Sequence, residues 1–138
     1  MKKERKETEE EKIEMAKEAI AKKYRALCGG SDMHCDIWRA DEFRTSLSGK
    51  IMAYRIHRKY FTLRPGVSDY YHGIGILDVG SGKEISKTLM DKYDMADAIY
   101  PSFSFSDKRK EISKILSVSD ERKVKYLTED GLEHVVEV

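Results

Sequence analysis

The stretch GIGILDVGSGKE, residues 73–84, decides between two folds for this chain. An apolar run ends at the acidic residue Asp78 and is followed by Gly80 and Gly82, an order in which many nucleotide- and cofactor-binding loops begin. The same residues suit a tight turn between antiparallel strands, because glycine adopts positive φ angles without strain. The first possibility gives a parallel sheet with a cofactor site, and the second gives an antiparallel sheet without one.

The stretch resembles the first motif of the Rossmann-like S-adenosylmethionine methyltransferases, whose strand ends in an acidic residue and runs into Gly-x-Gly-x-Gly. Here the third glycine position holds Glu84, and the 56 residues after Gly82 are few for a large parallel sheet, since one strand–helix–strand unit takes about 30 or more. A phosphate-binding P-loop is excluded too, because Leu77 stands where that loop needs a glycine. We therefore predict a turn from Asp78 to Lys83 between antiparallel strands, and no bound cofactor.

The composition indicates a soluble, cytoplasmic protein with a modest core. Apolar residues make up 40% of the 138 residues and charged residues 37%, and 26 Lys and Arg against 25 Asp and Glu leave a formal charge of +1. This balance does not favour a protein dedicated to nucleic acids or membranes. The charged N-terminal segment lacks the apolar core of a signal peptide, and no apolar run approaches the roughly 20 residues of a membrane helix. Cys28 and Cys35 are expected to be reduced, and residues 1–138 are expected to form a single domain.

Residues 8–28 are predicted to form an amphipathic helix. Thr8 and Glu11 have the spacing of a capping box, in which two side chains satisfy backbone N–H groups at a helix start. Apolar residues then recur at steps of three and four and so share one helical face. These residues are Ile13, Ala16, Ile20, Tyr24 and Leu27. Gly29 and Gly30 are predicted to end the helix.

Residues 32–138 are predicted to form an antiparallel β-meander of six to eight strands, with the helix packed on it or closing one end. Strands are expected over residues 33–38, 50–64 and 69–79, where β-branched and aromatic residues alternate with polar ones. A closing hairpin is expected over 123–138, because two alternating runs flank an Asp-Gly turn. The predicted fold class is α+β.

A near-repeat occurs in the second half of the chain, KEISKTL at residues 83–89 and KEISKIL at 110–116. A duplicated strand–turn–strand unit and chance similarity both account for it. The second copy is predicted to be a strand. The first copy fits either a strand or a helix over residues 84–98, because Ile85 and Leu89 also have helical spacing.

The basic and aromatic stretch YRIHRKYFTLR, residues 54–64, is the first candidate binding surface. In a strand, Met52, Tyr54 and Ile56 would face the core, and the alternating basic side chains would face water. Basic residues beside aromatic rings are the combination that binds single-stranded nucleic acids, and the same surface suits a partner protein. The candidate residues are Arg55, His57, Lys59, Arg64, Tyr70 and Tyr71. The alternative is a strand whose charges only keep its outer face solvated and its edge protected.

Aromatic residues also define a candidate ligand cavity. The stretch YPSFSFSD, residues 100–107, places Phe103 and Phe105 on one face of a strand. In a small barrel these two side chains would line a cavity together with Trp38 and Tyr54. Packing of the four side chains in the core is the alternative.

No metal or catalytic site is predicted. Cys28, His34 and Cys35 lack the paired spacing of zinc sites. Cys35 would form a nucleophile–base pair with His57 or His72 only if the fold brought them together, and nothing in the sequence indicates that it does.

The order of these segments resembles an uncharacterised family of small β-rich proteins of gut Bacteroidales, often associated with conjugative transposons. The residues that carry the resemblance are Leu27–Gly29 and Val118–Val138. In that family a Leu-x-Gly opening precedes an extended strand, and a hairpin around an Asp-Gly turn closes the chain. The resemblance implies a lipocalin-like antiparallel meander or partial barrel, and it implies no assigned activity.

These observations lead us to expect a non-enzymatic binding or accessory module for a protein or a small apolar ligand. Nucleic-acid contact through residues 54–64 is the first alternative, and an enzyme with an unrecognised site is the second. The oligomeric state stays open.

Overall fold

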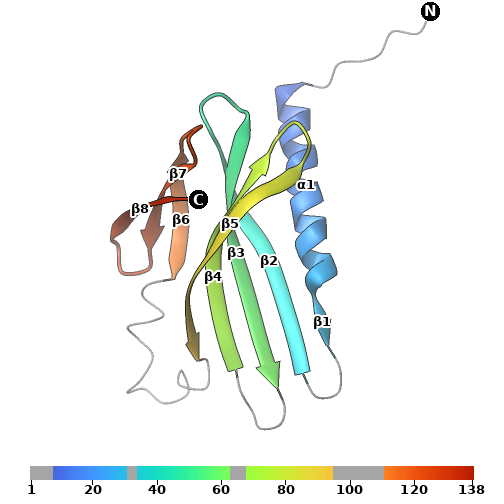
Figure 1. Ribbon diagram of the computed structural model, residues 1–138, viewed down its shortest axis with the longest axis vertical. Coiled ribbons are helices and arrows are strands. Elements are labelled where there is room, and N and C mark those ends of the chain that lie inside the picture. The colour runs from blue at the N-terminus through green and yellow to red at the C-terminus, as the bar shows by residue number, and fades with distance from the viewer. Residues whose placement is uncertain (1–7, 31–33, 63–67, 95–110) are drawn as a thin grey trace, which may run out of the picture.

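The computed structural model describes residues 8–30, 34–62, 68–94 and 111–138, with side chains described outside 68–70 and 90–94. Within these ranges one α-helix is followed by eight strands, which form a five-stranded and a three-stranded sheet. Every strand pair is antiparallel. The predicted α+β class and the curl of a partial barrel are confirmed (Figure 1).

The helix α1 spans Glu9–Leu27, close to its predicted range. Thr8 is its N-cap, and the Thr8 hydroxyl accepts a hydrogen bond from the backbone N–H of Glu11. This bond satisfies one of the N–H groups that a helix start leaves without an internal partner. The buried face of α1 carries Ile20 and Tyr24, which pack against the five-stranded sheet.

The five-stranded sheet is a meander in which consecutive strands are neighbours. Its strands are β1 (Gly29–Gly30), β2 (His34–Thr45), β3 (Ile51–Thr62), β4 (Ser68–Asp78) and β5 (Lys83–Asp94). The sheet curls so that α1 contacts both β2 and β5 (Figure 1). In β2 the register of pairing with β3 shifts between Asp41 and Arg44, where Glu42 has a φ of 55°. A bulge of this kind adds curvature to a strand.

The predicted turn after Asp78 is confirmed, and it reverses the chain between β4 and β5. The backbone N–H of Gly82 donates to the Asp78 carbonyl at 2.8 Å, and the Ser81 N–H donates to the Asp78 carboxylate at 2.9 Å. Gly82 has a φ of +70°, which residues with a Cβ rarely adopt. The chain continues as a strand, so the helical alternative for residues 84–94 is wrong, and residues 95–98 lie outside the described ranges.

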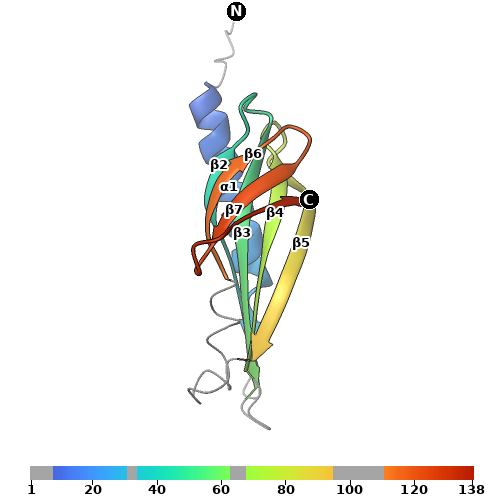
Figure 2. The same ribbon diagram turned by 90° about the vertical axis from the view of Figure 1, so that its left-hand side faces the viewer.

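The three-stranded sheet covers the opposite face of the five-stranded sheet from α1 (Figures 1 and 2). Its strands are β6 (Ile112–Val118), β7 (Lys123–Thr128) and β8 (Glu133–Glu137). β7 and β8 form the predicted closing hairpin, whose turn contains Gly131 with a φ of +84°. The predicted strand in the second copy of the near-repeat is β6. The expected meander is therefore divided into two packed sheets.

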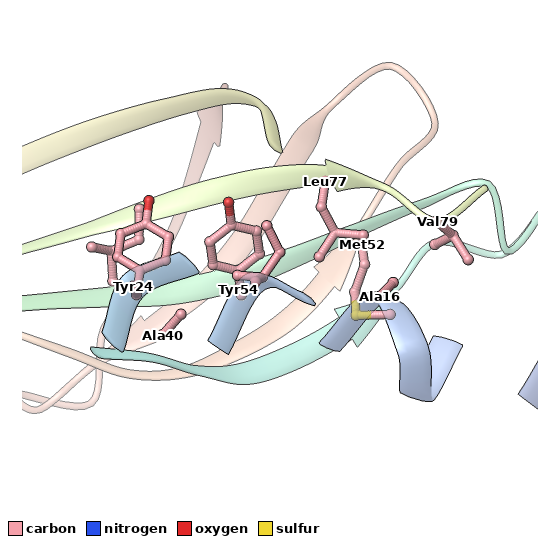
Figure 3. Packing of buried hydrophobic residues seen from close by; sticks show 9 residues of the cluster. Ala16, Tyr24, Ala40, Met52, Tyr54, Leu77 and Val79 are labelled. Carbon is pink, nitrogen blue, oxygen red and sulfur yellow. The ribbon is translucent and has the colours of Figure 1, made fainter. Parts of the chain in front are cut away.

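Each face of the five-stranded sheet has its own hydrophobic core. On the α1 side, Figure 3 shows Tyr24 of the helix packed beside Tyr54 of β3, with Met52 and Leu77 further along. The core on the other side consists of Ile51, Ala53, Ile74, Ile76, Ile112, Ile115, Val118 and Val124. Because β3 and β4 are buried on both faces, these strands are apolar over much of their length rather than alternating.

Gly73 and Gly75 of β4 leave room on the α1 side of the sheet. A Cβ at Gly75 would lie 2.4–2.5 Å from atoms of the Tyr54 side chain, which is fully buried. A Cβ at Gly73 would lie 2.3 Å from the carbonyl oxygen of Thr88 in β5. These two glycines therefore allow close packing of side chain and backbone against β4.

Replacing Gly75 by alanine is expected to lower the free energy of unfolding by about 1–3 kcal/mol, because the new methyl group overlaps the enclosed Tyr54 ring. Urea unfolding followed by circular dichroism measures the change. Gly29→Ala is the matched control, because nothing lies within 4 Å of a Cβ at Gly29. The control is expected to change stability by about 0.5 kcal/mol or less. Equal stability of the two variants would contradict the tight packing of Tyr54 on Gly75.

Candidate functional site at the open end of the curled sheet

The Glu84 carboxylate joins α1 to the centre and the outer strand of the five-stranded sheet. Its side chain, on β5, is 7% exposed and accepts hydrogen bonds from the hydroxyl groups of Tyr24 in α1 and Tyr54 in β3. Figure 3 shows the two tyrosine rings side by side with their hydroxyl groups pointing in the same direction. The ammonium groups of Lys23 and Lys87 lie 3.3 and 3.9 Å from Glu84 Oε1. The nearly buried charge is thus hydrogen-bonded and has counter-charges beside it.

These contacts shift the pKa values of all three groups. Burial alone would raise the pKa of Glu84, but the hydrogen bonds from Tyr24 and Tyr54 and the nearby lysine charges outweigh it. The pKa of Glu84 therefore lies below its ordinary value. Burial, followed by the contact with Glu84, raises the pKa of Tyr24 and of Tyr54. At neutral pH the carboxyl group is ionised and both hydroxyl groups are protonated, which is the state that the hydrogen bonds require.

The lower ends of β2, β3 and β4 extend past the C-terminal end of α1 (Figure 1). These strands carry an arginine among aromatic rings, and the ring centroid of Trp38 in β2 is 5.9 Å from that of Tyr24 in α1. Trp38, Arg58 and Tyr71 lie directly opposite one another on the three strands. The guanidinium carbon of Arg58 is 4.7 Å from the ring centroid of Trp38. Its distances to the ring centroids of Tyr71 and Tyr60 are 5.4 and 5.7 Å, within the range of cation–π attraction. We call Trp38, Arg58, Tyr60 and Tyr71 the aromatic surface.

Asp36 holds the Arg58 side chain in place. The two Asp36 carboxylate oxygens accept hydrogen bonds from the guanidinium group at 3.0 and 2.9 Å, a bidentate arrangement. These hydrogen bonds lower the pKa of Asp36 and raise that of Arg58, so both groups stay ionised. All four residues of the aromatic surface are half-buried. The surface is therefore both fixed in position and partly open to solvent.

The basic side chains that were predicted to face water lie instead on the face that packs against the second sheet. Arg55 donates hydrogen bonds to both oxygens of Asp41, at 2.7 and 3.1 Å, and to two backbone carbonyls of β6. His57 is 7% exposed, and oxygens of Asp41 and Glu111 lie 3.4 and 3.6 Å from its ring nitrogens. Burial would raise the pKa of Asp41, but the contacts with His57 and Arg55 hold it well below its usual range. The prediction that Arg55 and His57 face water is wrong, because Arg55 bonds to β6 and His57 is buried with Asp41 and Glu111 beside its ring.

The remaining residues of the predicted basic surface do not all share a face. Lys59 lies on the same face as His57 and is half-buried, with its ammonium 5.8 Å from the ring centroid of Phe61. Tyr71 lies on the α1 side, where it contacts Arg58. Arg64 lies outside the described residues, as does the side chain of Tyr70.

The predicted cavity residues are also separated. Tyr54 is fully buried and packs against Tyr24 and Phe43, with ring centroids 6.1 and 5.6 Å apart. Its place in the core is the alternative that the sequence left open. Trp38 is half-buried and packs against the same core, with its ring centroid 5.9 Å from that of Tyr24. Phe103 and Phe105 lie outside the described residues.

The candidate nucleophile–base pair does not form. Cys35 is opposite Phe61, four residues along β3 from His57, a distance of roughly 13 Å in a strand. His72 lies opposite His57 on β4, further still from Cys35.

In the part of the chain that the structure describes, no group of three or more His, Cys, Asp or Glu side chains is arranged to hold a metal ion. None of the described residues form a helix with the length and apolar character needed to span a membrane.

Three acidic residues of these clusters have no counterpart in the predicted site, namely Asp36, Asp41 and Glu84. Asp36 and Asp41 lie in β2, and the arginines that they bind lie in β3. Oppositely charged residues on the two strands of one predicted hairpin are therefore the sequence signal that would have indicated these pairs. No such signal exists for Glu84, because its hydroxyl donors come from other parts of the chain.

No protein-family model, no curated protein and no solved structure matches this chain. The resemblance to the Bacteroidales family therefore stays a prediction.

Replacing Glu84 by glutamine is expected to lower the free energy of unfolding at pH 7 by about 1–3 kcal/mol, because a neutral amide oxygen is a weaker acceptor than the carboxylate for the two tyrosine hydroxyl groups and does not attract the two lysines. The folded-state pKa of Glu84 lies below the unfolded value of about 4.3, so its stabilisation is complete above that pH and is lost as the pH falls through the folded-state value. The difference between wild type and variant should therefore shrink as the pH is lowered below about 4. Urea unfolding of both proteins in a series of buffers from pH 7 to acidic pH measures this difference in the free energy of unfolding.

The control for this experiment is Glu14→Gln in α1. Glu14 is 71% exposed and pairs with Lys17 at 3.3 Å, so its loss should change stability by less than about 0.5 kcal/mol. A Glu84→Gln variant as stable as this control, or a difference that does not depend on pH, would contradict the described role of Glu84.

Proposed function

We propose that this protein is a non-enzymatic binding module whose recognition site is the aromatic surface at the open end of the half-barrel. The observation that supports this most directly is the Arg58 side chain, which is held by Asp36 and lies within 5.7 Å of three aromatic ring centroids. Tryptophan, tyrosine and arginine are the residues most enriched at the positions that dominate binding energy. If these strands carried polar residues only to keep their outer face solvated, they would not need a cluster of half-buried aromatic rings.

The aromatic surface is suited to binding because its side chains are already ordered. Strand register sets Trp38 and Tyr71 on either side of Arg58, and Asp36 fixes the guanidinium group. A ligand therefore does not have to immobilise these side chains, which lowers the entropic cost of binding. The ligand is a small apolar molecule or an apolar segment of a protein, as expected from the sequence.

Nucleic-acid contact through residues 54–64 has less support. It depends on basic side chains that can reach phosphate groups, whereas Arg55 and Arg58 are each paired with an aspartate in a bidentate arrangement. An enzymatic role has less support as well, because the carboxylate of Asp36 and the guanidinium group of Arg58 are bound to each other.

We also propose a reducing, cytoplasmic location. Cys28 and Cys35 are both free thiols, as is usual in that compartment. The Cys28 sulfur accepts a hydrogen bond from the backbone N–H of Trp38 at 3.1 Å. A reduced Cys28 thus helps to position the strand that carries the aromatic surface.

The test is native mass spectrometry of the protein purified from its own cells, at low and at moderate salt. The wild type is expected to carry a bound mass, and Tyr71→Ala is expected to reduce its occupancy about tenfold, because the variant loses one ring of the aromatic surface. Leu47→Ala, in the turn between β2 and β3, is the control, because Leu47 is fully exposed and lies nine residues beyond Trp38, past the end of the paired strands. Urea unfolding checks that both variants are folded. Bare wild-type protein, or equal occupancy in Tyr71→Ala, is the result that rejects the proposal.

A further inference from the structure

An unbalanced positive charge lies beside the aromatic surface. Lys23 and Lys87 approach one carboxylate, that of Glu84, at 3.3 and 3.9 Å from Oε1. Asp36 and Arg58 neutralise each other. The described side chains of this cluster are therefore three cations and two carboxylates, and their net charge is +1.

Lys87 is the residue of this cluster that is best placed to present the positive charge to a ligand. Its ammonium lies 5.8 Å from the ring centroid of Trp38 and 5.9 Å from that of Tyr24, and its side chain is 40% exposed. The distance of 3.9 Å to Glu84 is too long for a hydrogen bond. Glu84 already accepts hydrogen bonds from two tyrosines and from Lys23. The Lys87 ammonium therefore has N–H groups available for a further acceptor.

We propose that the aromatic surface binds a small aromatic anion, whose ring stacks on the aromatic surface and whose negative group pairs with Lys87. This inference rests on the proposed function and narrows its ligand to a small molecule that has an apolar aromatic ring and also carries one negative group. An aromatic ring complements the half-buried rings of Trp38 and Tyr71, and one negative charge complements the unbalanced ammonium. The surface lies on the face of the sheet that packs against α1, where the Trp38 ring lies beside that of Tyr24.

The test compares two fluorescent probes that share one aromatic skeleton. Anilinonaphthalene sulfonate carries a negative charge, and phenylnaphthylamine is its uncharged counterpart. Trp38 is the only tryptophan of the chain, so energy transfer from tryptophan to the probe reports that the probe binds within the transfer distance of Trp38. The wild type is expected to bind the sulfonate about tenfold more tightly than the uncharged probe, and this preference should decrease as salt screens the charge.

Variants of Lys87 identify the charge that is responsible. Lys87→Gln is expected to weaken sulfonate binding about tenfold and to leave binding of the uncharged probe unchanged. Lys87→Arg keeps the charge and should bind the sulfonate as the wild type does. Lys125→Gln on β7 is the matched control, because Lys125 is 47% exposed and also has one carboxylate nearby, at 3.4 Å. The control should bind both probes as the wild type does, and urea unfolding verifies that each variant is folded.

The outcomes separate this inference from the proposed function. Equal affinity of the wild type for the two probes, or unchanged sulfonate binding in Lys87→Gln, would overturn the inference and leave the proposed binding module intact. Absence of energy transfer from Trp38 to either probe would contradict the proposed function as well.

Discussion

One buried carboxylate holds the helix and the curled sheet together. Glu84 accepts hydrogen bonds from Tyr24 in α1 and from Tyr54 in the central strand β3. An ionised group so little exposed is tolerated only with such donors and counter-charges around it. Its partners impose further constraints, since the Tyr54 ring needs the space above Gly75, and β5 must return beside β4 through the turn at Gly82. The glycine-rich stretch therefore serves packing and chain reversal, which explains why it resembles a cofactor loop only in its order of residues.

The aromatic surface depends on one register shift in the neighbouring hairpin. The turn between β2 and β3 pairs Thr45 with Met52. If that register continued unchanged, Trp38 would lie opposite Lys59. The bulge in β2 shifts the pairing by one residue and sets Trp38 opposite Arg58 instead. The row of tryptophan, arginine and tyrosine across three strands, on which the proposed function rests, exists only because of this shift.

Local signals in the sequence predicted local structure well. The helix, the turn after Asp78 and the closing hairpin follow from capping residues, glycines and alternating patterns, each of which acts over a few positions. Features that depend on distant segments could not be predicted. The bulge has no evident marker in the sequence, the burial of His57 requires a second sheet to pack on that face, and the hydroxyl donors of Glu84 are 60 and 30 residues away. The predicted cavity and the predicted basic surface accordingly contribute one residue each to the aromatic surface, Trp38 and Tyr71, and neither contains Asp36, which holds Arg58 in place.

The central claim is that Tyr24 and Tyr54 are coupled through the carboxylate of Glu84. The most direct measurement is the free energy of unfolding of Tyr24→Phe, of Tyr54→Phe and of the double variant, because phenylalanine removes each hydroxyl group and keeps each ring. We predict that the two losses are not additive, with a coupling energy of about 0.5–3 kcal/mol. Additive losses would contradict the coupling of the two hydroxyl groups through one shared carboxylate.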